Sequence, residues 1–427
     1  MKKRLSLAAA LVLLLSVTGC SANESALNGA EGGYFGTDIG GRPAGAKGEA
    51  AADMMTGGGI PGEGDGAALT AESPMAAPPG GLFEDMGDAS QAIPPQSGLL
   101  TGGEWNDNAH WADWKALYDS RSDWEGYKSD WRIKAVNRLA VKVQNENGEP
   151  VEGAKVTAEN RMSAVTNNKG MAYLFGEGSP DSLTVSKGDI SVTKNYTRSD
   201  SANDAEETIT LVGASSAGSK KLDFMIMCDT TGSMSDELEY LKAELSDIVK
   251  KIKSDNANIP TRVSVNFYRD EGDEYVVRQF PFSDNIDDVV KAIGEQSAEG
   301  GGDFPEAVHT ALDSAVNKHE WNDDSVKIMF LVLDAPPHSE TQIIDSVNAY
   351  VAKAAEMGIR IIPIASSGID KSTEYLLRTM AFTTGGTYTF LTSDSGIGGD
   401  HIEPTVGAFN VEKLGDMMVR IVNEYLK

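Results

Sequence analysis

The sequence predicts an α/β protein with a doubly wound, mostly parallel sheet, preceded by a small β-sandwich and a disordered tether. Two observations carry this prediction. From residue 222 onward, apolar runs alternate with amphipathic helical patterns, an order that favours a parallel sheet with helices on both faces. Between residues 137 and 212, short alternating strands are separated by turns, which is typical of a sandwich.

The elements after residue 222 can be assigned in order. The strands are LDFMIMC, RVSVNFY, VKIMFLVL, IRIIPIA and TYTFL, and EYVVRQF follows RVSVNFY closely enough to form a hairpin with it. The helices are DELEYLKAELSDIVKKIKSD, DNIDDVVKAIGEQS, PEAVHTALDSAVNKH, TQIIDSVNAYVAKAAEMG, STEYLLRTMAFTTG and VEKLGDMMVRIVNEYLK. Ligands of such sheets bind beyond the carboxyl ends of the strands, so the residues that follow the strands are the first candidates for a site.

Composition excludes some functions. The chain has 427 residues and a formal net charge of -27, so no basic stripe is present for a nucleic-acid backbone, and no nucleic-acid partner is expected. The two cysteines, Cys20 and Cys228, exclude a scaffold built on disulfides. Cys228 lies within an apolar strand and is expected to be a packed core residue.

The first twenty residues predict a signal peptide. MKKR supplies a positive start, LSLAAALVLLLS is a short apolar run, and VTGC ends it. The VTGC sequence resembles a bacterial lipobox. That resemblance implies that Cys20 is acylated and anchors the protein to the cell membrane or the outer membrane, on an extracytoplasmic face. The alternatives are an ordinary secretory signal and a short transmembrane anchor.

Residues 21–103 are rich in Gly, Ala, Pro, Ser and acidic residues and show no sustained apolar period. Such a segment cannot bury enough apolar surface to fold, so we expect a disordered tether. Its root-mean-square reach is about 50 Å, which is long enough to hold folded domains clear of a lipid surface.

Residues 104–135 contain five of the six tryptophans, at loosely helical spacing. An exposed aromatic stripe would be a binding surface or a platform for saccharides. The alternative, which we favour, is a helical segment whose rings dock onto the domain that follows.

Residues 136–213 form the predicted sandwich. The segments NGEPVEGAKV and TNNKGMAYLF resemble the carboxypeptidase regulatory-like family of extracellular β-sandwiches. The resemblance implies a fold and a spacer role, and it implies no chemistry.

Oxygen-bearing side chains follow two of the apolar strands and occupy one glycine-rich turn. Asp229, Thr231 and Ser233 come directly after the first strand, Asp303 lies in EGGGDFPEA, and Asp334 directly follows the apolar run FLVL in FLVLDAPPH. Hard oxygen ligands without a thiolate pair suit Mg²⁺ or Mn²⁺. The alternative is that each motif only caps a helix.

These three motifs, DTTGSM, GGGDFPEA and LVLDAPPH, resemble a von Willebrand factor A domain with its metal-ion-dependent adhesion site. The resemblance spans residues 220–427 and implies that Asp229, Thr231, Ser233 and Asp334 surround the metal. The family usually has a second serine in place of Thr231, which keeps the hydroxyl.

The glycine-rich loop departs further from the family, which usually offers a threonine there. The resemblance carries this role to Asp303. A third carboxylate should make the metal less electrophilic towards an acidic ligand, and should make the empty site more dependent on its cation, because three like charges meet.

The histidines contribute less. His338 follows Asp334 closely and is placed at the rim of the site, His309 is expected to be packed or at the surface, and His401 belongs to a glycine-rich loop across the domain surface. The acidic turn 269–275 is expected to be solvated, with a secondary cation site as the alternative.

The sequence predicts a membrane-anchored extracytoplasmic lipoprotein that binds a protein partner through a divalent cation, with one coordination position open to a carboxylate or another oxygen of that partner. No HExxH, GxSxG or Walker pattern occurs, so an enzyme is not expected. The alternatives are a metal-dependent hydrolase, for which only Asp334 or His338 offers a base, and a structural envelope protein with a degenerate site.

Overall fold

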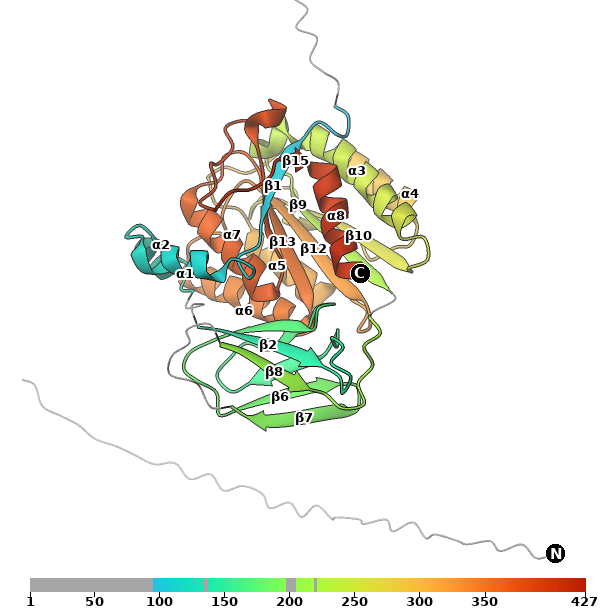
Figure 1. The fold of residues 1–427 in the computed structure, drawn as a ribbon. Coiled ribbons are helices and arrows are strands. Elements are labelled where there is room, and N and C mark those ends of the chain that lie inside the picture. The colour runs from blue at the N-terminus through green and yellow to red at the C-terminus, as the bar shows by residue number, and fades with distance from the viewer. Residues whose placement is uncertain (1–94, 134–136, 197–204, 219–220) are drawn as a thin grey trace, which may run out of the picture. The chain divides into compact units, whose positions relative to one another are not determined.

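The computed structural model describes residues 95–133, 137–196, 205–218 and 221–427 (Figure 1). The predicted signal peptide with Cys20, and the tether up to residue 94, lie outside the described residues. Within the described ranges, no helix is both long enough and apolar enough to cross a membrane.

The central sheet has eight strands in the order β11-β10-β9-β12-β13-β14-β1-β15. The pairs β10–β9, β9–β12, β12–β13 and β13–β14 are parallel, whereas β11, β1 and β15 add antiparallel edges. The sheet is therefore mostly parallel, as predicted. The bounds are β1 (Thr101–Trp105), β9 (Leu222–Asp229), β10 (Thr261–Tyr268), β11 (Val277–Arg278), β12 (Val326–Leu333), β13 (Ile359–Ala365), β14 (Tyr388–Leu391) and β15 (Glu412–Lys413).

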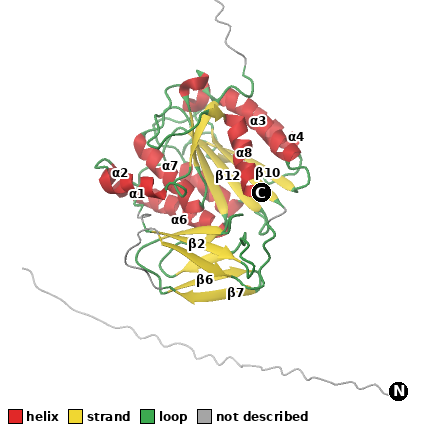
Figure 2. Ribbon diagram, in the orientation of Figure 1, coloured by secondary structure: helices red, strands yellow, loops and turns green. Residues whose placement is uncertain are grey.

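Helices cover both faces of this sheet (Figures 1 and 2). One face packs against α3 (Leu238–Asp255), α4 (Ile286–Gly294) and α8 (Leu414–Leu426). The other packs against α5 (Val308–Asp313), α6 (Thr341–Met357) and α7 (Lys371–Thr384). The doubly wound prediction is confirmed.

The central strands are buried on both sides. Every residue of β9, β12 and β13 is buried, which is why these strands read as continuous apolar runs without alternation. Cys228 has no exposed surface and is a free thiol. Its place in the core agrees with the prediction.

Residues 138–196 and 205–210 form two small sheets around one apolar cluster, which we call the two-sheet domain. One sheet has the order β5-β2-β8 and the other β4-β3-β6-β7. The resemblance to the carboxypeptidase regulatory-like family stays a prediction. The strands are β2 (Arg138–Gln144), β3 (Lys155–Ala158), β4 (Ala164–Val165), β5 (Met171–Phe175), β6 (Ser182–Lys187), β7 (Ile190–Asn195) and β8 (Ala205–Thr210).

The tryptophan-rich segment does not dock mainly where it was expected. It begins as β1, continues as α1 (Trp111–Ser120) and α2 (Trp124–Asp130), and packs on α7, far along the chain. The Trp114 ring lies 5.4 Å from Tyr375 and 4.8 Å from Phe382, centroid to centroid. Of the next domain, Phe175 of β5 is in contact with a tryptophan ring, Trp111.

A buried ion pair fixes this segment. Arg378 of α7 donates to both oxygens of Asp107, at 3.0 and 2.6 Å, and both side chains are 1 % exposed. The tether was predicted to reach residue 103, yet Leu100 is buried and β1 pairs with β14. The folded region therefore begins earlier than composition indicated, because glycines 102 and 103 serve as strand residues here.

We predict that Trp114→Ala lowers the free energy of unfolding by about 3–5 kcal/mol, the usual cost of truncating a buried aromatic side chain. Urea unfolding of the parent and the variant measures the change. Lys115→Ala, a surface change on the same helix, is the control. Equal stability of Trp114→Ala and the control would show that the segment does not stabilise the α7 face.

Candidate metal centre

The sheet brings two of the predicted carboxylates together. Asp229 is the last residue of β9, and Asp334 follows the end of the neighbouring parallel strand β12. The register pairs Cys228 with Val332, so the two strands end at the same level. Both carboxylates are buried, Asp229 completely and Asp334 with 4 % exposure.

The two predicted hydroxyls join Asp229 in a short chain of hydrogen bonds. Thr231 donates to Asp229 Oδ1 through its backbone N–H at 2.8 Å and through its hydroxyl at 2.7 Å. The Thr231 and Ser233 hydroxyl oxygens are 3.1 Å apart. The turn η1 (Gly232–Asp236) then leads into α3.

The helix-cap alternative is not supported by these contacts. Thr231 precedes η1 and Glu237 precedes α3, and neither side chain makes a capping hydrogen bond. Ala307, which precedes α5, cannot make one. The side chains of the first motif point to each other and to the carboxylates.

One oxygen of each carboxylate has no hydrogen-bond partner. Asp229 Oδ2 and Asp334 Oδ1 are both buried and unpaired. Burial, together with the charge of Asp334, raises the pKa of Asp229 to about 7. Burial also raises the pKa of Asp334 to about 6, against a hydrogen bond with Ser233 that lowers it. A bound cation would satisfy both orphaned oxygens and offset both charges.

The glycine-rich loop supplies a different carboxylate from the one predicted. The structure does not bring Asp303 into this group; its side chain is exposed. Glu306, three residues on, is 2 % exposed, and its Oε2 is also buried and unpaired. Burial and then the charge of Asp229 raise the pKa of Glu306 to about 9, and the charge of Asp334 contributes.

Backbone contacts direct Glu306 inward. Its N–H donates to the carbonyl of Pro336, in the loop after Asp334, at 2.8 Å. A Cβ added to Gly301 would lie 3.0 Å from Glu306 Oε1 and 3.4 Å from Thr231 Cβ, and Gly301 has φ +72°. The glycine therefore allows the loop to pass close to Thr231 while Glu306 reaches the same region. Sequence reasoning assigned Glu306 to a helix start and missed this placement.

The acidic turn 269–275 is solvated at its tip, as predicted, since Glu271 and Glu274 are exposed, but its first two residues are buried and support the neighbouring loops. Arg269 and Asp270 are buried, and Asp273 Oδ2 accepts from the Gly301 N–H at 2.9 Å. His338 Nε2 lies 2.7 Å from Asp270 Oδ1. The turn thus connects the glycine-rich loop, through Asp273, with the loop after Asp334, through Asp270.

The remaining histidines lie outside this group. His309 has its Nε2 3.7 Å from Glu271. The side chain of His401 is 2 % exposed, and its Nε2 lies 2.9 Å from Glu237 Oε1. The segment GIGGDHIEP, which carries His401, is therefore attached to the start of α3.

Across the described residues, no group of three or more His, Cys, Asp and Glu side chains is arranged to hold a metal ion. The donors gathered here are of mixed kind: two carboxylates at the strand ends, two hydroxyls, and the nearby Glu306. A set made only of oxygen donors, with buried oxygens that lack a partner, is the kind of ligand set that hard divalent cations bind.

Residues 223–400 match the von Willebrand factor A domain family, so the chain contains a von Willebrand factor A domain. A domain of this class indicates a role in protein interaction or adhesion. The family match agrees with the doubly wound, mostly parallel sheet described above.

Two curated proteins share part of this sequence. The chain is 33% identical over 125 residues to a putative ariadne-like RING finger protein of Acanthamoeba polyphaga mimivirus, covering 29% of this chain and 12% of that protein. It is 23% identical over 175 residues to an alpha-protein kinase, vwkA, of Dictyostelium discoideum, covering 41% and 28%. The chain therefore spans less than a third of either relative.

Among solved structures, the conserved hypothetical protein BatB from Bacteroides thetaiotaomicron aligns with a TM-score of 0.34 and 12% identity. The alignment covers 48% of this chain and 98% of that one.

The raised pKa values predict a pH dependence of the metal-free protein. The three carboxyls have pKa values of about 7, about 6 and about 9, against ordinary values of 3.8, 3.8 and 4.5. At a pH between the ordinary and the raised pKa of a group, that group is protonated in the folded chain and ionised in the unfolded chain. The folded chain therefore binds more protons, and the free energy of unfolding falls as the pH rises through this range. Urea unfolding in chelator at about pH 5 and about pH 8 measures the change.

Asp229→Asn removes one of the three titrating groups, so its free energy of unfolding should fall less steeply with pH than that of the parent. Asp303→Asn, an exposed carboxyl in the same region, should keep the parent's slope. Identical slopes for the parent and Asp229→Asn would contradict the raised pKa of the buried Asp229 carboxyl.

Proposed function

We propose that this protein is a lipid-anchored, extracytoplasmic binding protein whose von Willebrand factor A domain holds Mg²⁺ or Mn²⁺ and uses it to bind a protein partner. The cation would offer an open coordination position to a carboxylate or another oxygen of the partner. The observation that carries the proposal is the pair of unpaired, buried oxygens, Asp229 Oδ2 and Asp334 Oδ1, at the ends of adjacent strands.

The residues that would hold the cation are Asp229, Thr231, Ser233 and Asp334, with Glu306 as the third carboxylate. The hydroxyls of Thr231 and Ser233 already lie in one hydrogen-bonded chain with Asp229. Glu306 supports the site because it is the buried carboxylate of the glycine-rich loop. Asp303 lies on the exposed part of that loop.

Hydrolysis with the same cation has less support. A metal-dependent hydrolase needs a base that is free to take a proton from water. His338 Nε2 is paired with Asp270 at 2.7 Å, which leaves Nδ1 as the ring nitrogen for that role, and Asp334 is proposed as a ligand. A binding role requires neither residue to act as a base.

The first test is a calorimetric titration with Mg²⁺, combined with thermal unfolding. Saturating Mg²⁺ should stabilise the parent, by about 2.7 kcal/mol at 100 times the dissociation constant, because the cation binds the folded state. Asp229→Asn should remove this gain and should remove Mg²⁺-dependent capture of the partner in a pull-down. Equal Mg²⁺ affinity in the parent and Asp229→Asn would rule out the site.

The second test separates the two carboxylates of the glycine-rich loop. Glu306→Gln should weaken Mg²⁺ binding about tenfold or more, and should raise the melting temperature of the metal-free protein near pH 7, because Glu306 must take up a proton to be buried and Gln need not. Asp303→Asn is the matched variant and should change neither value. If Asp303→Asn weakens Mg²⁺ binding and Glu306→Gln does not, Asp303 and not Glu306 is the ligand.

The anchoring proposal is tested separately at VTGC. Cys20→Ser should either release the protein from the membrane fraction or leave it uncleaved with its signal attached. A variant that fractionates and migrates like the parent would contradict lipidation at Cys20, whatever the result at the cation site.

A further inference from the structure

A second region of interest lies at the opposite end of the sheet from the candidate metal centre. There, a cavity of about 1020 Å³ is bordered by the two-sheet domain and by the residues at which β12 and β13 begin. Strand β9 is eight residues long, so the two regions are about 25 Å apart. The metal centre does not account for this cavity.

The cavity carries an excess of positive charge in a chain whose net charge is -27. Six basic side chains line it, with four carboxylates. Two of the carboxylates are already in ion pairs, Glu356 with Lys155 at 2.7 Å and Asp324 with Lys221 at 2.8 Å. The local sign is therefore opposite to that of the whole chain.

Three of the cations have only carbonyl oxygens as their hydrogen-bond acceptors in the described structure, with no carboxylate within ion-pair distance. Lys187 of β6 donates to the Ser215 carbonyl at 3.3 Å, and Lys327 of β12 donates to the Asp323 carbonyl at 3.3 Å. Arg360 of β13 donates to the carbonyls of Thr384 and Val165, both at 2.7 Å. A neutral carbonyl does not cancel a positive charge.

Burial is the dominant influence on all three groups. It lowers the pKa of Lys187, although Glu152 opposes it. It lowers the pKa of Lys327 against the charges of Asp323 and Asp223, and it lowers the pKa of Arg360. The carboxylates of the protein therefore do not fully compensate for the loss of water around these cations.

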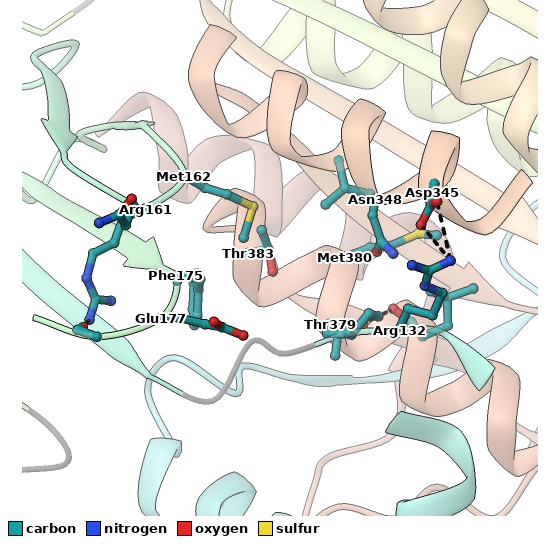
Figure 3. A pocket seen from close by; sticks show the side chains of 16 residues that line it. Arg132, Arg161, Met162, Phe175, Glu177, Asp345, Asn348, Thr379, Met380 and Thr383 are labelled. Carbon is teal, nitrogen blue, oxygen red and sulfur yellow. Dashed lines mark hydrogen bonds and ion pairs between the residues drawn. The ribbon is translucent and has the colours of Figure 1, made fainter. Parts of the chain in front are cut away.

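A second large cavity has equal numbers of positive and negative side chains in its lining. This cavity, of about 1090 Å³, has apolar lining residues that include Met162, Phe175 and Met380 (Figure 3). Its two arginines are matched by two carboxylates, and Arg132 lies 3.3 Å from Asp345. Its lining therefore has no excess charge that would select a charged ligand.

We propose that the cavity lined by Lys187, Lys327 and Arg360 is a binding site for a small ligand that carries phosphate groups. The three cations come from three different strands and line one space, and the fork of an arginine with the point charges of lysines suits phosphate oxygens. The volume exceeds that of a single phosphate, so an oligophosphate or a phosphate ester fits.

The test uses inorganic pyrophosphate as the probe and the whole soluble chain as the sample, with chelator present to exclude metal complexes. Pyrophosphate should bind in a saturable manner by calorimetry and should raise the melting temperature, whereas sodium chloride at equal ionic strength should not. Lys187→Met and Lys327→Met each remove one charge-assisted contact and should each weaken binding about tenfold.

Lys194→Met is the matched control, because Lys194 lies on the neighbouring strand β7, pairs with Glu207 and does not line the cavity. It should bind pyrophosphate like the parent. A loss of affinity equal to that of Lys187→Met, or no saturable binding to the parent, would overturn the proposal. Because Arg360 also joins the two-sheet domain to the sheet, it is left unchanged.

Discussion

The burial of two carboxylates at the carboxyl ends of adjacent central strands, to which the repulsion of Asp229 by Asp334 adds, is the constraint on which the functional end of this domain depends. Strands β9 and β12 are buried throughout, so their register is fixed by packing on both faces. That register places Asp334 one residue beyond the level of Asp229, so both carboxylates lie at the same ends of neighbouring core strands. The loops around them enclose this group of buried carboxylates. We propose that the group serves to hold a divalent cation.

Those loops hold one another in place. The glycine-rich loop is held to the acidic turn through Gly301 and Asp273, and to the loop after Asp334 through Glu306 and Pro336. The acidic turn in turn contacts His338. Three segments that are far apart in the chain therefore form one support. A substitution in any of them would alter the positions of the buried carboxylates.

Much of this fold could be predicted because its signals are local. The continuous apolar runs of β9, β12 and β13 and the periodic helices after them are typical of a doubly wound sheet, and Asp229 and Asp334 follow from strand ends alone. Glu306 could not be placed, because the direction of its side chain depends on a backbone bond to Pro336 and on the passage of Gly301 beside Thr231. The docking of Trp114 on α7 is likewise a contact between distant segments, with no signal in the local sequence.

The most direct test of the central claim is a crystal structure of the folded chain grown with Mn²⁺, with an anomalous difference map calculated at the manganese edge. The account predicts one strong peak within coordination distance, about 2.0–2.6 Å, of oxygens from the first motif or of waters bound to Asp229 and Asp334, with Glu306 beside it. A map with no peak between the ends of β9 and β12, at a Mn²⁺ concentration that saturates the calorimetric titration, would contradict it.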